Sequence, residues 1–148
     1  MSGNQPYTYN AETEELNPLL GHDRRTFLAS EADTEADRQS SAIENPNARG
    51  LFLHVNLANI EGTPEYTPAV QVESNDSWIE LFTASSVLGG SAGDFLYVLY
   101  PGATYSGGNN LEEAADIALP RRFRVVLKAT TAGGSNRADT LVAGGLLH

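Results

Sequence analysis

Residues 48–73, ARGLFLHVNLANIEGTPEYTPAVQVE, decide the fold class. In the first half of this stretch every second residue is a large aliphatic one, and the set is Leu51, Leu53, Val55 and Leu57. Alternation with a period of two is typical of a strand with one buried face. A Gly-Thr-Pro corner at 62–64 breaks the pattern, and Val70 and Val72 mark a second strand after it. The stretch therefore predicts two strands joined by a corner.

Further strand-like segments lie downstream, at 77–84, 95–102, 121–131 and 138–148. The segment 95–102, FLYVLYPG, is apolar on both faces, which predicts a central strand. In 121–131 the residues expected to face inward are Phe123, Val125, Leu127 and Ala129. Six short strands with Gly-rich turns predict an all-β fold, a small antiparallel β-sandwich of jelly-roll or immunoglobulin-like type. Between strands, residues 103–120 have room for one short helix capped by Asn110, or for a crossover loop.

Residues 1–47 differ from the sandwich region, which we expect at 48–148. They are polar and acidic and sustain neither a strand period nor a helix period, apart from a weak helix expected over 26–38. Such a segment does not fold alone, so we interpret it as a long extended arm that folds on a partner surface. An arm packed on its own domain is the alternative. If the arm folds on a partner, its apolar residues are spaced anchors for that partner: Tyr7, Tyr9, Leu16, Leu19, Leu20, Phe27 and Leu28.

Composition excludes several classes of function. The chain of 148 residues is most simply one domain, and it has no cysteine, which removes thiol catalysis, disulfides and cysteine-ligated zinc. Nine basic residues against nineteen acidic ones give a net charge of -10, so we expect no binding to nucleic acid. No apolar run approaches the roughly 20 residues that span a bilayer, so we expect no membrane segment.

Candidate catalytic and metal-binding residues are few. Ser91 lies in GGSAG, which fits the nucleophile-elbow pattern, but a strand rather than a helix follows it, so a hairpin turn explains it better. The histidines His22, His54 and His148 are scattered without ligand spacing, and His54 is expected to face solvent or a subunit contact.

Glu112, Glu113 and Asp116 cluster in the 103–120 loop. We interpret them as surface charge, with a calcium site as the alternative, although their spacing is not that of a regular calcium loop. The sequence therefore predicts no enzyme, no catalytic residue, no metal and no cofactor.

Two surfaces are candidates for contacts between chains. Arg121, Arg122 and Arg124 form a basic cluster, read either as exposed edge charge or as a docking patch for acidic groups of a neighbour, such as the arm of another copy. The last strand runs apolar through Gly144 and Gly145, and an exposed strand of that kind would aggregate. We therefore expect a homo-oligomer, with a trimer favoured, whose interface contains Leu146 and Leu147.

Four segments resemble, in this order, a family of small virion structural proteins of tailed bacteriophages. They are RGLFLHVNLANIEGTPEYTPAVQVE (49–73), YVLYPGA (97–103), LPRRFRV (119–125) and LVAGGLL (141–147). The acidic arm is not part of the shared pattern. The resemblance implies a β-sandwich with a structural role in the capsid, neck or tail.

The acidic charge favours a position away from packaged DNA. The leading hypothesis is a capsid decoration, or cement, protein in the virion, bound to the outer capsid surface formed by the major capsid protein and stabilising it. A tail or neck component is the first alternative. A host-surface carbohydrate-binding module is the second, and its candidate aromatic residues are Trp78, Tyr100 and Tyr105.

Overall fold

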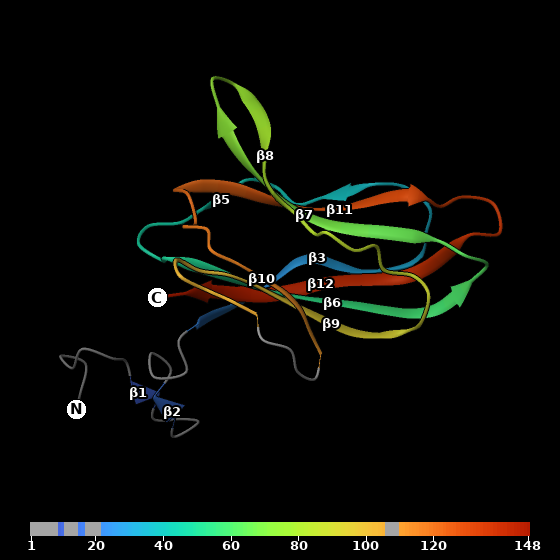
Figure 1. The fold of residues 1–148 in the computed structure, drawn as a ribbon, viewed down its shortest axis with the longest axis horizontal. Coiled ribbons are helices and arrows are strands. Elements are labelled where there is room, and N and C mark those ends of the chain that lie inside the picture. The colour runs from blue at the N-terminus through green and yellow to red at the C-terminus, as the bar shows by residue number, and fades with distance from the viewer. Residues whose placement is uncertain (1–8, 11–14, 17–21, 106–109) are drawn as a thin grey trace.

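The computed structural model describes residues 9–10, 15–16, 22–105 and 110–148 of the chain. The described part is all-β, with two sheets stacked as the layers of a sandwich (Figure 1). This confirms the prediction of an all-β sandwich, whereas its jelly-roll or immunoglobulin-like type stays a prediction. In chain order the strands are β1 (Tyr9–Asn10), β2 (Glu15–Leu16), β3 (His22–Thr34), β4 (Arg38–Gln39), β5 (Ile43–Glu44), β6 (Gly50–Glu61), β7 (Glu65–Ser74), β8 (Ser77–Thr83), β9 (Gly93–Leu99), β10 (Leu111–Ala115), β11 (Arg122–Thr131) and β12 (Arg137–Leu147).

The first sheet has the strand order β10-β9-β6-β12-β3. All neighbouring pairs in it are antiparallel except β9 and β10, which are parallel. The predicted central strand, β9, is indeed an interior strand between β10 and β6. The helix expected over part of 103–120 is wrong, because residues 111–115 form β10 instead. The alternative, a crossover connection, agrees with the parallel pairing, since parallel neighbours require the chain to return before pairing.

The second sheet has the order β4-β11-β7-β8, with β5 also paired to β11. β7 and β8 form a hairpin closed by the pair Ser74 and Ser77. The two residues between them, Asn75 and Asp76, have φ of 52° and 61°. Positive φ at both central residues is typical of the tight turns that match strand twist, and Asn and Asp tolerate it. The tip of this hairpin projects beyond the sandwich (Figure 1).

The core lies between the sheets and follows the predicted alternation. The side chains that the period of two places inward on β6 and β11 are almost completely buried: Leu51, Leu53, Val55, Leu57, Phe123, Val125 and Leu127. Tyr66 of β7 and Tyr97 of β9 add two buried rings to this core. The prediction for these two strands is therefore confirmed, except that Ala129 is only partly buried against the core.

The predicted boundary at residue 48 is wrong, because residues 22–44 belong to the sandwich. β3 pairs with β12 from His22, opposite Leu147, to Thr34, opposite Ala138. β4 and β5 then pair with β11 in the other sheet. The weak helix expected over 26–38 is likewise wrong. The long-range ladder to β12 overrides local propensity, which is a weak preference in any sheet.

Irregular pairing explains why the sequence of β3 shows no period of two. The register between β3 and β12 shifts three times. Thr26 lies opposite Ala143 and Leu28 lies opposite Val142, so Phe27 is an extra residue without a register partner. A bulge of this kind lets two consecutive side chains point to the same side. Phe27 and Leu28 are accordingly both buried in the chain's own core, and their interpretation as anchors for a partner is wrong.

β12 is an interior strand, flanked by β6 on one side and β3 on the other. The expectation that it is an open edge in need of a symmetric neighbour is therefore wrong. Leu146 lies in the core at 1% exposure, and only Leu147 is half-buried. Gly144 has φ of 149°, and a Cβ there would lie 1.8 Å from the carbonyl oxygen of Phe52. This contact explains the glycine, which the close approach of β6 and β12 requires.

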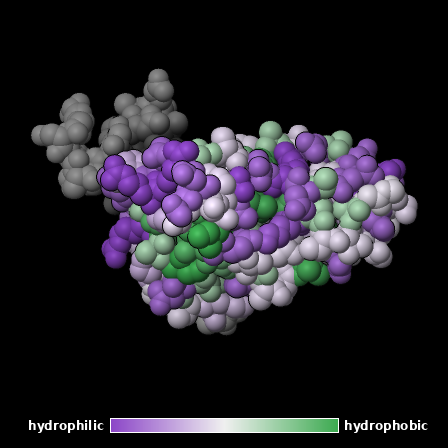
Figure 2. All heavy atoms as spheres, turned by 90° about the horizontal axis from the view of Figure 1, so that it is seen from above, coloured by the Kyte–Doolittle hydropathy of each residue, from purple (hydrophilic) through white to green (hydrophobic). Residues whose placement is uncertain are grey.

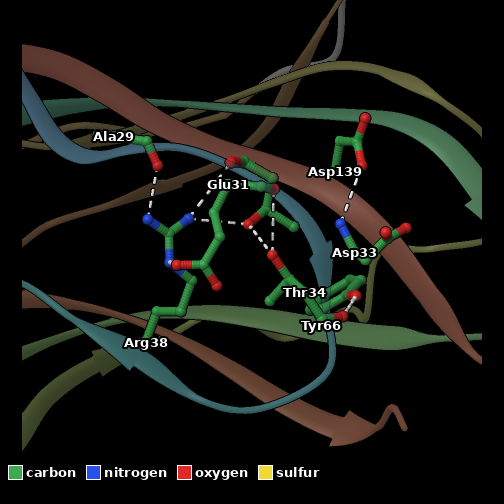
Figure 3. A network of polar contacts seen from close by, with 8 residues as sticks. Ala29, Glu31, Asp33, Thr34, Arg38, Tyr66 and Asp139 are labelled. Carbon is green, nitrogen blue, oxygen red and sulfur yellow. Dashed lines mark hydrogen bonds and ion pairs between the residues drawn. The ribbon is translucent and has the colours of Figure 1, made fainter. Parts of the chain in front are cut away.

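A polar network fixes β3 and the segment after it to both sheets (Figure 3). The Tyr66 hydroxyl donates to the Thr34 carbonyl at 2.5 Å, and the Thr34 and Thr140 hydroxyls are 2.7 Å apart. Arg38 donates to the Thr140 hydroxyl at 2.9 Å and to the Ala29 carbonyl at 2.5 Å. Buried polar groups are costly unless they are paired, so this satisfied network specifies one path for residues 29–38.

Candidate binding surface

A shallow trough lies on the outer face of the first sheet, over β12 and between β3 and β6. Its volume is about 530 Å³, and it is lined by Arg24, Arg25, Thr26, Phe52, His54, Ala143 and Gly144. Phe52 and His54 alternate with the buried Leu51 and Leu53, so they lie on the face of β6 that points away from the core.

The shape of the trough follows from residue size along two rows of the sheet. In one row Thr26, Ala143 and His54 lie side by side on β3, β12 and β6. In the next row Gly145 lies between Arg24 and Phe52. Small residues on the middle strand lower the floor, and larger side chains on the two neighbours form the walls.

The trough collects positive charge on an acidic chain. Elsewhere the cations other than Arg121 are engaged within the sandwich: carboxylates pair with Arg38, Arg122, Lys128 and Arg137, and aromatic rings lie under Arg49 and Arg124. Arg24 is exposed and makes no ion pair with any side chain that the structure describes. Together with the hydroxyl of Thr26, it gives this wall donors suited to a carboxylate or another anion. The neighbouring Arg25 already has a partner.

The opposite wall is ordered by a small hydrogen-bond cluster. His54 Nε2 lies 2.8 Å from Asp94 Oδ1, and Asn56 Nδ2 donates to the same oxygen at 2.8 Å. The hydrogen bonds from His54 and then Asn56 hold the pKa of the Asp94 carboxyl below its usual value. His54 is half-buried on the outer face, which agrees with the predicted solvent-facing position.

Reasoning from the sequence placed Arg24 and Arg25 in an arm and gave them no role. The available signal was the adjacent pair of cations in HDRRTF, within an otherwise acidic region. Their contribution to a trough depends on the pairing of β3 with β12, which no local pattern reveals.

The predicted basic cluster lies on the other sheet and is largely satisfied within the chain. Arg122 pairs with Glu44 at 2.8 Å and with Glu73 at 2.6 Å. Arg124 donates to the Gln71 side chain at 2.7 Å, and its guanidinium lies 4.5 Å from the centre of the Trp78 ring.

Arg121 is exposed, and only its backbone carbonyl has a described contact, the amide of Asn45 at 2.7 Å. Docking of a neighbour on this cluster stays a prediction. It would have to compete with the carboxylates that Arg122 already contacts.

The projecting β7–β8 hairpin carries a row of apolar side chains outward from the core. Phe123, Val72 and Ile79 lie side by side on β11, β7 and β8, and their exposure rises from 0% at Phe123 to 51% at Ile79. Figure 2, which views the molecule from the side of β8, shows a hydrophobic patch among hydrophilic atoms on this face. β8 is also an edge strand of its sheet.

The remaining predicted anchors precede β3. Tyr9 and Leu16 lie opposite each other in the two-stranded β1–β2 sheet. Tyr7, Leu19 and Leu20 lie outside the described residues. All five stay predictions as partner contacts.

The acidic loop residues act as hydrogen-bond acceptors for neighbouring loops. Glu113 accepts from the backbone amide and the hydroxyl of Ser85 at 2.9 and 3.1 Å. Asp116 accepts from the amide of Gly102 at 2.6 Å. Within residues 22–105 and 110–148, no group of three or more His, Asp or Glu side chains is arranged to hold a metal ion.

Comparisons with known proteins give no family. No model of a known protein family matches the chain, and no curated protein matches it either. In the described part of the chain, no helix is long and apolar enough to cross a membrane.

Proposed function

We propose that the protein decorates the outer surface of a bacteriophage capsid, with the sandwich as the outer body and residues 1–21 as the anchoring segment. One observation carries this proposal: β3 begins at His22, opposite Leu147, so the first strand of the sandwich begins at the end where its last strand finishes. The resemblance of four segments to small virion proteins of tailed bacteriophages supports a phage particle as the partner. The anchoring segment is shorter than the 47 residues predicted, because residues 22–44 are part of the fold.

The composition of residues 1–21 suits an anchor. Among them are the five apolar candidates Tyr7, Tyr9, Leu16, Leu19 and Leu20, separated by polar residues, and there is no Lys or Arg. A segment of this kind gains affinity by spreading a few apolar contacts over a large partner surface, at the cost of ordering itself. Contact with two neighbouring capsid subunits would tie them together, and binding energy specific to the intact shell then stabilises the shell by mass action.

The net charge of -10 supports an outward position. Packaged DNA is a dense polyanion and repels a protein of the same sign. The major capsid protein is therefore the proposed partner, and the protein's stability when free comes from its own core.

The carbohydrate-binding alternative finds less support. Its three aromatic residues are not on one face, since Trp78 is in β8 of the second sheet and Tyr100 follows β9 of the first. Arg124 lies over the Trp78 ring and Arg49 lies 5.5 Å from the centre of the Tyr100 ring. Sugar stacking would have to displace these guanidinium groups or use the other ring faces.

Saturation binding to separated particle parts tests the proposal. Purified protein is added to empty shells that lack it, and in parallel to isolated tails and necks, and bound copies are counted after sedimentation. Decoration predicts saturation on shells at a copy number set by the lattice and none on tails. Binding to tails or necks alone would overturn the capsid assignment in favour of the first alternative.

A further inference from the structure

We propose that the free edge of β8 pairs with the same strand of a second copy of this chain, antiparallel and about a two-fold axis at Ile79. The second sheet would then continue without a break through both copies. This inference goes beyond the proposed function and does not rest on it, since it requires only copies of this chain.

β8 is the open edge of the second sheet, since it pairs only with β7 among the strands that the structure describes. Its one register shift lies beyond Glu80, so the ladder from Ser77 to Glu80 is regular. The other edge strands are blunted, because β4 has two residues, β3 has three register shifts, and β10 has one shift within five residues. The hairpin that carries β8 projects beyond the sandwich, which leaves the edge near its turn accessible to a neighbour (Figure 1).

An apolar row of the sheet ends at this edge. Four side chains lie side by side in it, on β5, β11, β7 and β8: Ile43, Phe123, Val72 and Ile79. Ile79 is 51% exposed. Two other large apolar side chains are exposed in the described part of the chain, Val87 and Tyr105, and neither lies in a strand. A second β8 placed against the first would continue the row into its own copy and bury both Ile79 side chains.

The alternation of the β7–β8 ladder sets which backbone groups can pair across the edge. Ser74 and Ser77 close the two-residue turn, and in an antiparallel ladder a pair that exchanges hydrogen bonds is followed by a pair that does not. The amides and carbonyls of Trp78 and Glu80 are therefore directed to the free edge, whereas those of Ile79 are directed to β7. Three symmetric registers would pair these groups, centred on Trp78, Ile79 or Glu80.

Charge selects the register centred on Ile79. Centring on Glu80 places two carboxylates opposite each other, and centring on Trp78 places Glu80 opposite Asp76. Like charges directly opposite each other destabilise a sheet. Centring on Ile79 instead places each Glu80 beside the Trp78 ring of the other copy, and Arg124 lies 4.5 Å from the centre of that ring. The carboxylate thus meets a cation across the interface.

The contact is isologous, since the same strand meets itself about a two-fold axis. Its symmetry differs from that of the predicted trimer, and it involves neither Leu146 nor Leu147. Lys128, which pairs with Glu80 within the chain, adds a second cation near each carboxylate. A pairing of a few residues buries a small area, so we expect a weak dimer.

Sedimentation velocity of the full chain tests the proposal. The mass is expected to rise from 15.8 kDa toward twice that value as the concentration approaches about 1 mM. Ile79→Lys should weaken association about tenfold or more, because it places two cations opposite each other at the axis. Val87→Lys makes the same change at a side chain of similar exposure outside any strand, and it should leave association unchanged.

Disulfide formation tests the register, because the chain has no cysteine of its own. Ile79→Cys places two thiols in a pair without hydrogen bonds, whose Cα atoms are about 4.5 Å apart, so mild oxidation should give a covalent dimer. Ser77→Cys is the matched control in the same strand. Its two thiols would lie about 14 Å apart along the paired strands and should not crosslink.

A wild-type chain that stays monomeric up to about 1 mM would overturn the proposal. So would equal effects of Ile79→Lys and Val87→Lys, or equal crosslinking of Ile79→Cys and Ser77→Cys. If every variant is a monomer and Ile79→Lys alone loses binding to shells, the capsid protein covers this edge and the second copy is excluded. Should Ile79→Lys fail to fold by circular dichroism, the two cysteine variants decide alone.

Discussion

Replacing Leu28 with Ala tests whether residues 22–34 belong to the core of the free protein. If they formed an arm that folds only on a partner, removing this side chain would not change the stability of the isolated chain. In the structure Leu28 is 5% exposed, lies in the central hydrophobic cluster and is opposite Val142 in the ladder. The substitution should therefore destabilise the fold.

The magnitude follows from the position of Leu28. Truncating a buried Leu to Ala costs about 2–5 kcal/mol, and the cost is smaller where the surroundings can collapse into the cavity. β3 is an edge strand with three register shifts, so it can move toward β12 and the cost should lie near about 2–3 kcal/mol. With a urea dependence of about 2 kcal/mol per molar, the unfolding midpoint should fall by about 1–1.5 M.

Urea unfolding followed by far-ultraviolet circular dichroism measures this shift, and fluorescence of the single tryptophan gives a second signal. Leu19→Ala is the matched control, since the sequence places both leucines among the anchors but Leu19 precedes β3. It should leave the midpoint of the free protein unchanged. A Leu28→Ala midpoint within about 0.3 M of that control would mean that β3 is not part of the stable fold, and the reasoning would be refuted.

Three further outcomes follow from the core. Phe123→Ala should cost about 3–5 kcal/mol in the same titration, since the ring is fully buried, and a cost below about 1 kcal/mol would mean that the face of β11 is misassigned. Tyr66→Phe should cost about 1–3 kcal/mol because it leaves the Thr34 carbonyl without its donor, and an unchanged midpoint would show that this bond contributes nothing. Burial raises the pKa of Tyr66 and of Tyr97 above the usual value. The contribution of these two buried neutral tyrosines to the free energy of unfolding is therefore fully present below the unfolded pKa of about 10, and it is lost as the pH rises through the folded values. Urea midpoints should fall as the pH rises above about 10, less so in Tyr97→Phe, and identical losses in both proteins would contradict the assignment.

The regular strands could be predicted because each carries its signal locally. β6 and β11 alternate without interruption, and one face of each packs on the core, so the period of two in their sequences is also the pattern of burial. The Gly-Thr-Pro corner at 62–64 separates β6 from β7 as expected. These features can be predicted without knowing which distant segments of the chain pair with each other.

β3 and the trough could not be predicted for the opposite reason. β3 pairs with a strand more than 100 residues away, and three register shifts remove the alternation from its sequence. The position of Arg24 and the burial of Leu146 both depend on that pairing. Because β3 was not predicted, the length of the arm, the open edge at the last strand and the interface at Leu146 were all predicted wrongly. The contacts of Arg122 with Glu44 and Glu73 were hidden for the same reason, since they join three strands.

The most direct test of decoration through the N-terminal segment is the binding of two truncated proteins to shells that lack the protein. Deleting residues 1–21 removes no strand of the sandwich, so this variant should keep the wild-type unfolding midpoint and lose at least about tenfold in affinity for shells, as expected when spaced apolar anchors are removed. Deleting residues 1–45 removes β3 and should abolish cooperative unfolding, contrary to an arm that ends at residue 47. Full occupancy of shells by the 1–21 deletion at the wild-type concentration would contradict the account.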